Sequence, residues 1–169
     1  MSGIIGVSPD MRSGVIGAFP SGQIIQVNNA VLSGTGAAIS HSGGWADTGL
    51  ATSFATLKQA NTKILMQFSM CLDFYTTDSA AMAQCEDSIA GATYAEIMDS
   101  QAYLRNDIGT HGLQHYAVCA GFIKTLSNSA GDSYNIKVRV YETSGDVRTH
   151  YNTGRTSRRS HLTIYELAV

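Results

Sequence analysis

Apolar and polar residues alternate along several stretches of this chain, as is typical of strands that bury one face. The strongest alternation lies within TKILMQFSMCLDF, where six apolar residues hold every second position: Ile64, Met66, Phe68, Met70, Leu72 and Phe74. Polar residues stand between them, among them Gln67, Ser69 and Asp73. A second stretch, YNIKVRVYE, repeats the pattern with four inward positions: Tyr134, Ile136, Val138 and Val140. We therefore expect two long strands with one buried face each.

Four further stretches fit strands less completely. Residues 116–126, YAVCAGFIKTL, are apolar on both faces, which predicts a central strand covered on each side. Near the carboxyl end, HLTIYEL places Leu162 and Ile164 inward. Residues 22–32, GQIIQVNNAVL, and 49–57, GLATSFATL, are weaker strand candidates.

Clusters of Gly, Ser, Asn and Asp separate these stretches, as expected for turns. They occupy the ranges 33–36, 41–44, 127–132 and 144–146. The last cluster lies between two strand-like stretches and predicts a hairpin. The sequence leaves two alternatives for residues 79–100, a short helix or a long excursion. Their Ala-rich start favours a helix, but Gly91 interrupts it. Short strands, polar turns and little helix together predict an all-β fold, an antiparallel β-sandwich or jelly roll.

Composition narrows the function classes. The chain has 169 residues, which suits one domain with a sizeable core. Its formal net charge is -2 and 14% of its residues are charged, so it lacks the Lys/Arg footprint of a nucleic-acid binder. The basic cluster Arg155, Arg158 and Arg159 favours a solvated loop or an interface over a phosphate site. The chain shows no transmembrane stretch and no signal peptide, so we expect no membrane contact and folding in a cytoplasm.

Candidate catalytic and metal-binding residues are few and poorly spaced. His111 and His115 lie four apart in HGLQH, but no Glu follows the first His and Gly112 indicates a loop. We therefore interpret them as residues without a metal. Asp73 and Asp78 could form a carboxylate pair, yet aspartates at strand ends are more often solvated or turn-forming.

The same interpretation applies to the adjacent carboxylates Glu86 and Asp87. A metal-dependent jelly-roll enzyme would need His and Glu ligands on neighbouring strands, and only His111, His115 and Glu142 are loosely placed for that. We therefore predict no enzyme activity, no metal and no cofactor.

The three cysteines, Cys71, Cys85 and Cys119, are an odd number at wide spacings. This excludes a full disulfide framework and matches no zinc pattern. We expect them to be reduced, with Cys71 and Cys119 as small apolar strand residues.

We interpret residues 1–22 as an extended arm in front of a β-sandwich domain, residues 23–169. The pentad SGIIG at residues 2–6 returns as SGVIG at residues 13–17. We expect the arm to pair with a sheet edge of a partner subunit, with apolar side chains in shallow pockets and one Arg near a carboxylate. The residues assigned to this contact are Ile4, Ile5, Arg12, Val15 and Ile16. In the alternative, the first pentad is a frayed tail and the second begins the first strand.

Aromatic residues leave two further questions open. Trp45 is the single tryptophan, and its amphipathic ring suits either one end of the sandwich core or a subunit interface. A sugar-binding face would need exposed aromatic rings, for which four tyrosines are candidates: Tyr75, Tyr94, Tyr103 and Tyr151.

The order of these features resembles that of small β-rich structural proteins of tailed bacteriophages, especially marine and cyanobacterial phages. The elements that carry the resemblance are MRSG at 11–14, the apolar run at 23–27, WADTGL at 45–50, TKIL at 62–65 and SHLTIYEL at 160–167. YLRND at 103–107 and SYNIKVRVYETSG at 133–145 also fit the order. The order carries the likeness, and residues 76–100 have no counterpart in it.

This resemblance implies a non-enzymatic virion protein, synthesised and assembled in the host cytoplasm and commonly a homotrimer. A capsid decoration (cement) protein fits the compact domain best, and a tail or fibre-associated protein for host adsorption is the alternative. The implied partners are further copies of the chain and either the major capsid protein or a tail or fibre subunit, with a host surface glycan as another candidate. A soluble carbohydrate-binding β-sandwich is the competing function from a different class.

Overall fold

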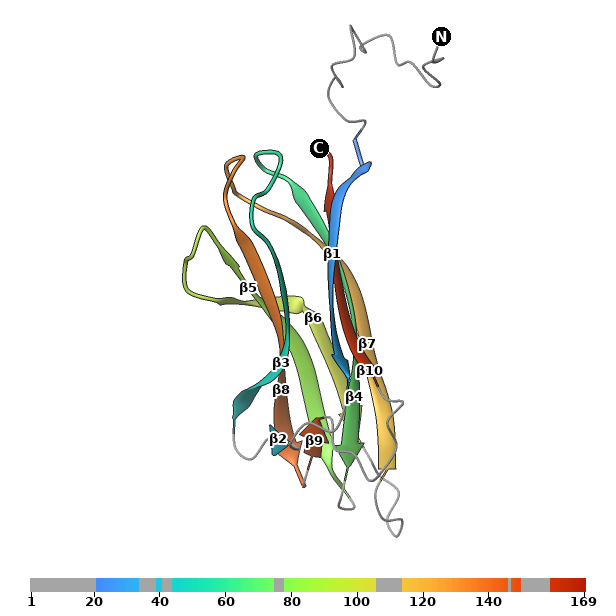
Figure 1. The fold of residues 1–169 in the computed structure, drawn as a ribbon. Coiled ribbons are helices and arrows are strands. Elements are labelled where there is room, and N and C mark those ends of the chain that lie inside the picture. Colours follow the sequence, from blue (N-terminus) through green and yellow to red (C-terminus); the bar gives the residue numbers. More distant parts are fainter. Residues whose placement is uncertain are drawn as a thin grey trace, which may run out of the picture.

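Two antiparallel sheets pack face to face, so the predicted all-β sandwich is confirmed (Figure 1). The computed structural model describes residues 21–33, 39–40, 44–74, 78–105, 114–145, 147–149 and 159–169. Its strands are β1 (Ile24–Ser33), β2 (Ile39–Ser40), β3 (Trp45–Phe54), β4 (Lys63–Phe74), β5 (Ala80–Ile89), β6 (Ala95–Arg105), β7 (Gln114–Thr125), β8 (Tyr134–Ser144), β9 (Val147–Thr149) and β10 (Arg159–Leu167). Within these ranges, no helix is long and apolar enough to cross a membrane.

Strand β4 is the centre of the six-stranded sheet. It pairs with β7 along its whole length, from Lys63 opposite Thr125 to Phe74 opposite Gln114. On its other side it pairs with β10 and then, near its end, with β9. β1 lies beyond β10, and β2 lies beyond β9. The four-stranded sheet has the order β3-β8-β5-β6.

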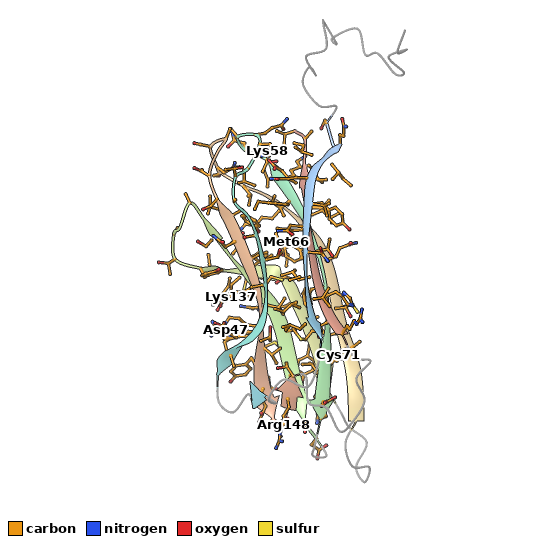
Figure 2. The ribbon with its side chains drawn as sticks, in the orientation of Figure 1. Asp47, Lys58, Met66, Cys71, Lys137 and Arg148 are labelled. Carbon is orange, nitrogen blue, oxygen red and sulfur yellow. The ribbon has the colours of Figure 1, made fainter. Side chains whose placement is uncertain are left out.

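The core fills the space between the sheets, and the alternating residues of β4 and β8 make its largest contribution. All the apolar residues predicted to face inward from these two strands are buried, and Figure 2 shows Met66 among the side chains between the sheets. Leu162 and Ile164 join them as predicted, and Leu50 and Phe54 of β3 complete the opposite wall. Each fully buried side chain of this size contributes roughly 1.5–3 kcal/mol. The period-2 pattern therefore locates the main stabilising contacts.

Both weaker strand candidates contain strands with shifted bounds. β1 covers most of residues 22–32, and β3 begins at Trp45, ahead of the predicted start. β3 ends at Phe54, and the chain then bends away from the sheet. Leu57 is still buried, and its N–H donates to the carbonyl of Asp132 at 2.7 Å, so tertiary contacts replace the strand ladder there.

Residues 79–100 form two strands, so the expectation of a short helix or a long excursion is wrong. β5 and β6 make a hairpin around Ala90 and Gly91, whose φ angles are 51° and 76°. Gly91 adopts this left-handed conformation without strain because it has no Cβ. β5 is buried on both faces, with small residues such as Ala81 and Ala83, so its sequence shows no alternation.

Strand β7 lies at an edge, so the prediction of a central strand covered on both faces is wrong. Its one strand partner among the described residues is β4. Val118 points inward and is buried, whereas Ala117, Cys119 and Ile123 are exposed on the outer face. The apolar residues on the second face of β7 therefore lie on the outer surface of the sandwich and are not covered by another layer of the described residues.

The predicted hairpin at residues 144–146 is also wrong. β8 belongs to the four-stranded sheet, whereas β9 pairs with β2 and β4 in the other sheet. The chain therefore crosses between the sheets at this turn, where Gly145 has a φ of 83°. β10 pairs with β4 only as far as Ser69, and β9 takes the place beside β4 from Leu72 onward, with Val147 fully buried.

Candidate interaction surfaces

The predicted N-terminal arm lies almost wholly outside the described residues. This applies to every residue assigned to the partner contact: Ile4, Ile5, Arg12, Val15 and Ile16. Their role stays a prediction. The described chain begins at Ser21, and the N–H of Gly22 donates to the carbonyl of Ala168 at 2.8 Å. Residues 21–22 lead directly into β1, which is an edge strand of the six-stranded sheet in the part of the chain that the structure describes.

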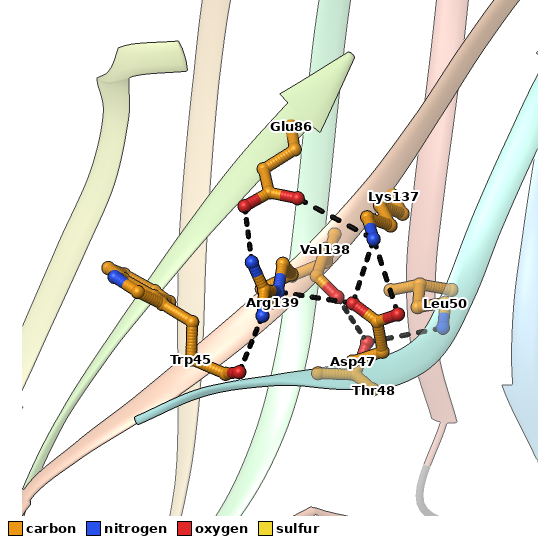
Figure 3. Close-up of polar contacts among 8 residues, drawn as sticks. All are labelled: Trp45, Asp47, Thr48, Leu50, Glu86, Lys137, Val138 and Arg139. Carbon is orange, nitrogen blue, oxygen red and sulfur yellow. Dashed lines mark hydrogen bonds and ion pairs between the residues drawn. The ribbon is translucent and has the colours of Figure 1, made fainter. Parts of the chain in front are cut away.

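The WADTGL motif builds a β-bulge in β3. Residues 48–50 stand opposite the single residue Val138 of β8. The Thr48 hydroxyl donates to the Val138 carbonyl at 2.7 Å and accepts the N–H of Leu50 at 3.1 Å (Figure 3). Gly49 has the positive φ of 79° that lets the strand bend here. The motif thus shapes the strand that carries Trp45.

Four charged side chains form a network on the outer face of the four-stranded sheet beside this bulge (Figure 3). The ammonium of Lys137 lies 3.0 Å from Oδ1 of Asp47 and 3.5 Å from Oε2 of Glu86. The guanidinium of Arg139 lies 2.6 Å from Glu86 and 3.1 Å from Asp47. It also donates to the carbonyl of Trp45 at 2.5 Å. Each cation contacts both carboxylates, so the network itself carries no net charge.

A row of large side chains runs across the same face. Strand register places four of them side by side: Trp45, Tyr141, Met82 and Tyr103. The rings of Trp45 and Tyr141 are 5.6 Å apart and tilted by 46°. Trp45 is half-buried here and does not belong to the buried core, so its interpretation as an interface residue stays a prediction.

Two of the tyrosines considered for a sugar-binding face, Tyr94 and Tyr103, are exposed. Tyr75 and Tyr151 lie outside the described residues. The ammonium of Lys137 lies 4.5 Å from the centre of the Tyr94 ring, a cation–π contact that holds the β5–β6 turn over the charged network. Aromatic rings beside fixed charged and amide groups suit recognition of a polar ligand with an apolar face, such as a sugar.

On the inner face, an ion pair crosses between the two sheets. The ammonium of Lys124 on β7 lies 2.8 and 2.7 Å from the carboxylate oxygens of Asp87 on β5, and the Tyr134 hydroxyl donates to the same carboxylate at 3.1 Å. Burial, and then the charge of Asp87, raise the pKa of the Tyr134 phenol far above its ordinary value. Burial raises the pKa of the Cys85 thiol to about 12. A reactive cysteine has a lowered pKa, so this cluster is built for stability.

A groove of about 330 Å³ lies along the edge where β6 and β7 come together. It is lined by residues 96–99 of β6 and 122–125 of β7. Met98 and Ile123 are exposed in it, although both are large and apolar. Sequence reasoning missed this groove because it combines the edges of two different sheets.

Three of the carboxylates interpreted as solvated or turn-forming are buried. Asp73 on β4 and the pair Glu86 and Asp87 on β5 are almost inaccessible to solvent, so the expectation is wrong for them. Asp78 is exposed in a turn with a φ of 60°, as expected. The partners of Glu86 and Asp87 lie on other strands, and no local pattern indicates them.

The described residues contain no group of three His, Cys, Asp or Glu side chains placed to hold a metal ion. His111 lies outside them, and His115 lies on the edge strand β7. None of the three cysteines forms a disulfide. Cys71 and Cys119 lie on the neighbouring strands β4 and β7, which confirms their prediction as strand residues.

The SHLTIYEL motif also serves the fold. The Ser160 hydroxyl accepts the N–H of Cys71 at 2.9 Å, between the parts of β4 that pair with β10 and with β9. Glu166 is fully buried, and its carboxylate accepts the N–H groups of Lys58 at 2.8 Å and Gln59 at 3.2 Å. These bonds fix the loop between β3 and β4. Two motif positions thus stabilise the sheet and its connections.

No family model and no curated protein matches this chain. Among solved structures, it is similar to Eiger TNF from S. frugiperda, with 13% identity over 84% of this chain and 93% of that one and a TM-score of 0.47. It is also similar to infectious bursal disease virus of the Gx strain, with 10% identity over 99% of this chain and a TM-score of 0.39. A VP2 subviral particle of the same virus gives 12% identity, 99% coverage and a TM-score of 0.37. This chain spans about two fifths of each viral chain, 41% and 42%, and the likenesses concern the fold alone.

Proposed function

We propose that this chain is a non-enzymatic structural protein of a bacteriophage virion, a capsid decoration protein that works as a homotrimer. The supporting observation is where exposed apolar side chains gather. Most of those in the described residues lie on edge strands: Ile24, Val27 and Val31 on β1, Met98 and Tyr103 on β6, and Ile123 on β7. Apolar side chains concentrated on open strand edges are typical of surfaces that contact another protein.

The low charge of the chain supports the same proposal. With 13 acidic and 11 basic residues, its net charge is -2. A protein that coats a particle lies close to many identical copies, and a small net charge keeps their mutual repulsion small. The motifs that carry the phage resemblance fit a scaffold role, because those at residues 45–50 and 160–167 shape strands and loops.

The arm is the proposed anchor to the capsid or to a tail or fibre subunit. Residues 1–22 precede β1, which pairs only with β10 among the described residues, so an arm of this length would start at an edge of the sheet. Deletion of residues 1–17 should leave a folded oligomer that no longer joins the particle, measured by circular dichroism and by co-sedimentation with particles. An unfolded deletion variant would place the segment in the core.

A host-binding role in a tail or fibre, or a carbohydrate-binding module, is the second candidate. The observation that favours it is the row of Trp45, Tyr141, Met82 and Tyr103 beside the charged network. Because Trp45 is the only tryptophan, its fluorescence reports directly on this face. Saturable quenching or shift on adding host surface glycans, lost in Tyr103→Ala, supports this function. An unchanged spectrum across a glycan panel counts against it.

Cryo-electron microscopy of the intact particle tests the main proposal. Density for this chain repeated across the capsid lattice supports the decoration role. Density that is found only at the tail or fibres would instead support a role in host adsorption. A particle without this chain overturns the virion proposal and brings the soluble sugar-binding function forward.

A further inference from the structure

We propose that copies of this chain associate head to tail, with the β1 edge of one copy docked into the groove between β6 and β7 of the next. The inference deepens the proposed function, since it rests on an oligomeric structural protein and names the two surfaces that join the copies. The β1 edge is defined here by Ile24, Val27 and Val31, and the β6–β7 groove by residues 96–99 and 122–125.

The β1 edge is only partly protected: a register shift lies between Ile24 and Gln26, and the side chains of Gln26 and Asn28 donate to the carbonyls of Thr56 and Ser53. Among the described residues β1 pairs only with β10, so its other side presents backbone N–H and C=O groups. Its sequence, IIQVNNAVLS, contains no charged residue and no proline. Native proteins usually protect a long edge strand with Lys, Pro or a covering segment. Val27, at 57% exposure, lies at this edge on the outer face of the sheet, in the same row as Ile123.

The β6–β7 groove offers a complementary apolar surface at the opposite edge of the six-stranded sheet. Met98 is 63% exposed and Ile123 is 59% exposed, on two adjoining edge strands. Phe122 is partly buried at the groove and packs on the core, so the lining is supported from beneath. Two edge strands side by side can accept the apolar side chains of a third strand.

The charges around the two surfaces are complementary. The groove carries the exposed carboxylates Glu96 and Asp99, while its one cation, Lys124, already pairs with Asp87. On the β1 side, no acidic residue lies on β1 itself, and the exposed Lys58 lies near Val27, because Thr56 accepts both the Lys58 ammonium at 3.3 Å and the Gln26 amide at 2.9 Å. An acidic groove and an edge flanked by a cation attract each other, whereas two grooves would repel.

Strand register places the two surfaces at the same level along the sandwich. Val27 pairs with Tyr165, Tyr165 with Leu65, and Leu65 with Ile123, in one row across the six-stranded sheet. A head-to-tail contact between surfaces at the same level adds little translation from copy to copy. Without a rise, such contacts close into a ring when the rotation from copy to copy divides a full turn, whereas a rise along the axis gives an open filament. A cyclic trimer is the ring that the proposed function requires.

The test uses full-length protein with one carboxylate added to each surface, as Val27→Asp and as Met98→Asp. The matched control is Gln67→Asp, which adds the same group at an exposed position in the middle of the same sheet face. Mass is measured by light scattering after size exclusion, and folding by circular dichroism. We expect an oligomer for the wild type and the control, and a shift to the 18.0 kDa monomer for both edge variants.

Mixing the two edge variants then separates a head-to-tail contact from symmetric ones. One variant keeps a working groove and the other keeps a working β1 edge, so the mixture should form two-chain complexes that neither variant forms alone. A mixture that stays monomeric, or two-chain complexes in one variant alone, overturns the inference. Edge variants that remain oligomeric overturn the inference but leave the virion proposal standing, because that proposal depends on density in the particle.

Discussion

Glu86 and Asp87 are neighbours in β5, yet they belong to two different regions of the molecule. Glu86 points to the outer face, where Arg139 and Lys137 surround its carboxylate. Asp87 points inward, where Lys124 reaches it from the other sheet. Both side chains are almost inaccessible, at 6% and 3% exposure. The two carboxylates differ in how many cations contact them and in which sheet those cations lie.

The outer network is redundant, whereas the inner pair is not. If Glu86 is lost, both cations still contact Asp47, which is 60% exposed and well solvated. If Asp87 is lost, Lys124 keeps no carboxylate partner in the described cluster, and the Tyr134 hydroxyl keeps only the weakly accepting sulfur of Met66. The inner pair also joins the two sheets, since β5 and β7 belong to different sheets. Loss of Asp87 should therefore lower the free energy of unfolding more than loss of Glu86.

The largest expected effect is that of Asp87→Asn. Removing one partner of a fully buried ion pair typically costs about 3–5 kcal/mol of unfolding free energy. Because the Lys124 side chain is 32% exposed and can be solvated, we expect the lower end of this range, about 3 kcal/mol. Urea denaturation followed by circular dichroism measures this loss. Replacing both partners, as Asp87→Asn with Lys124→Met, should recover part of it. A double variant no more stable than Asp87→Asn alone would show that the pair is not the cause.

The next effect is that of Glu86→Gln, the same change from acid to amide one residue earlier. It removes charge-assisted hydrogen bonds but leaves Lys137 and Arg139 beside Asp47, so we expect a loss of about 1.5–3 kcal/mol. The same urea titration provides the measurement. If Glu86→Gln proves as costly as Asp87→Asn, redundancy on the outer face is refuted.

Alkaline pH should weaken the inner region. The folded state raises the pKa of Cys85 from 9.0 to about 12, so above pH 9 the unfolded chain releases a proton that the folded chain keeps. Stability is therefore complete below pH 9 and falls as the pH rises, by about 1.4 kcal/mol per pH unit until the folded pKa is reached. Urea titrations at pH 8, 9 and 10 under reducing conditions measure the slope. Cys85→Ala should remove it between pH 9 and 10, before Tyr134 contributes.

The smallest effect should come from Asp47→Asn. Its carboxylate is 60% exposed, and ion pairs of such groups contribute less than about 1 kcal/mol. The loss should shrink further in high salt, which screens exposed charges. Comparing urea midpoints with and without added salt checks both statements. A large loss that salt does not reduce would mean that Asp47 positions the bulge of β3.

The composition of the two surfaces could be predicted from the sequence only in part. The chemistry of Trp45 suits either a core or an interface position, and the structure places it in a row with Tyr141, Met82 and Tyr103. The sequence separates these residues widely, so only strand pairing brings them together. One signal was available for the β1 edge, since IIQVNNAVLS has no charged residue. The absence of charged residues indicates a contact surface only once it is known that β1 lies at an edge of the sheet.

The sequence by itself determined the long half-buried strands, because side-chain direction in a strand depends only on the position of each residue along it. That is why the inward positions of β4 and β8 agree with the pattern, although Asp73 on the polar side of β4 is also buried. Tertiary structure alone decided which outer faces stay exposed, as on β7, and which carboxylates are buried, as with Glu86 and Asp87. It also decided that β8 and β9 belong to different sheets. Exposure, ion pairing and sheet membership depend on which distant strands lie alongside, and alternation within one strand carries no information about its neighbours.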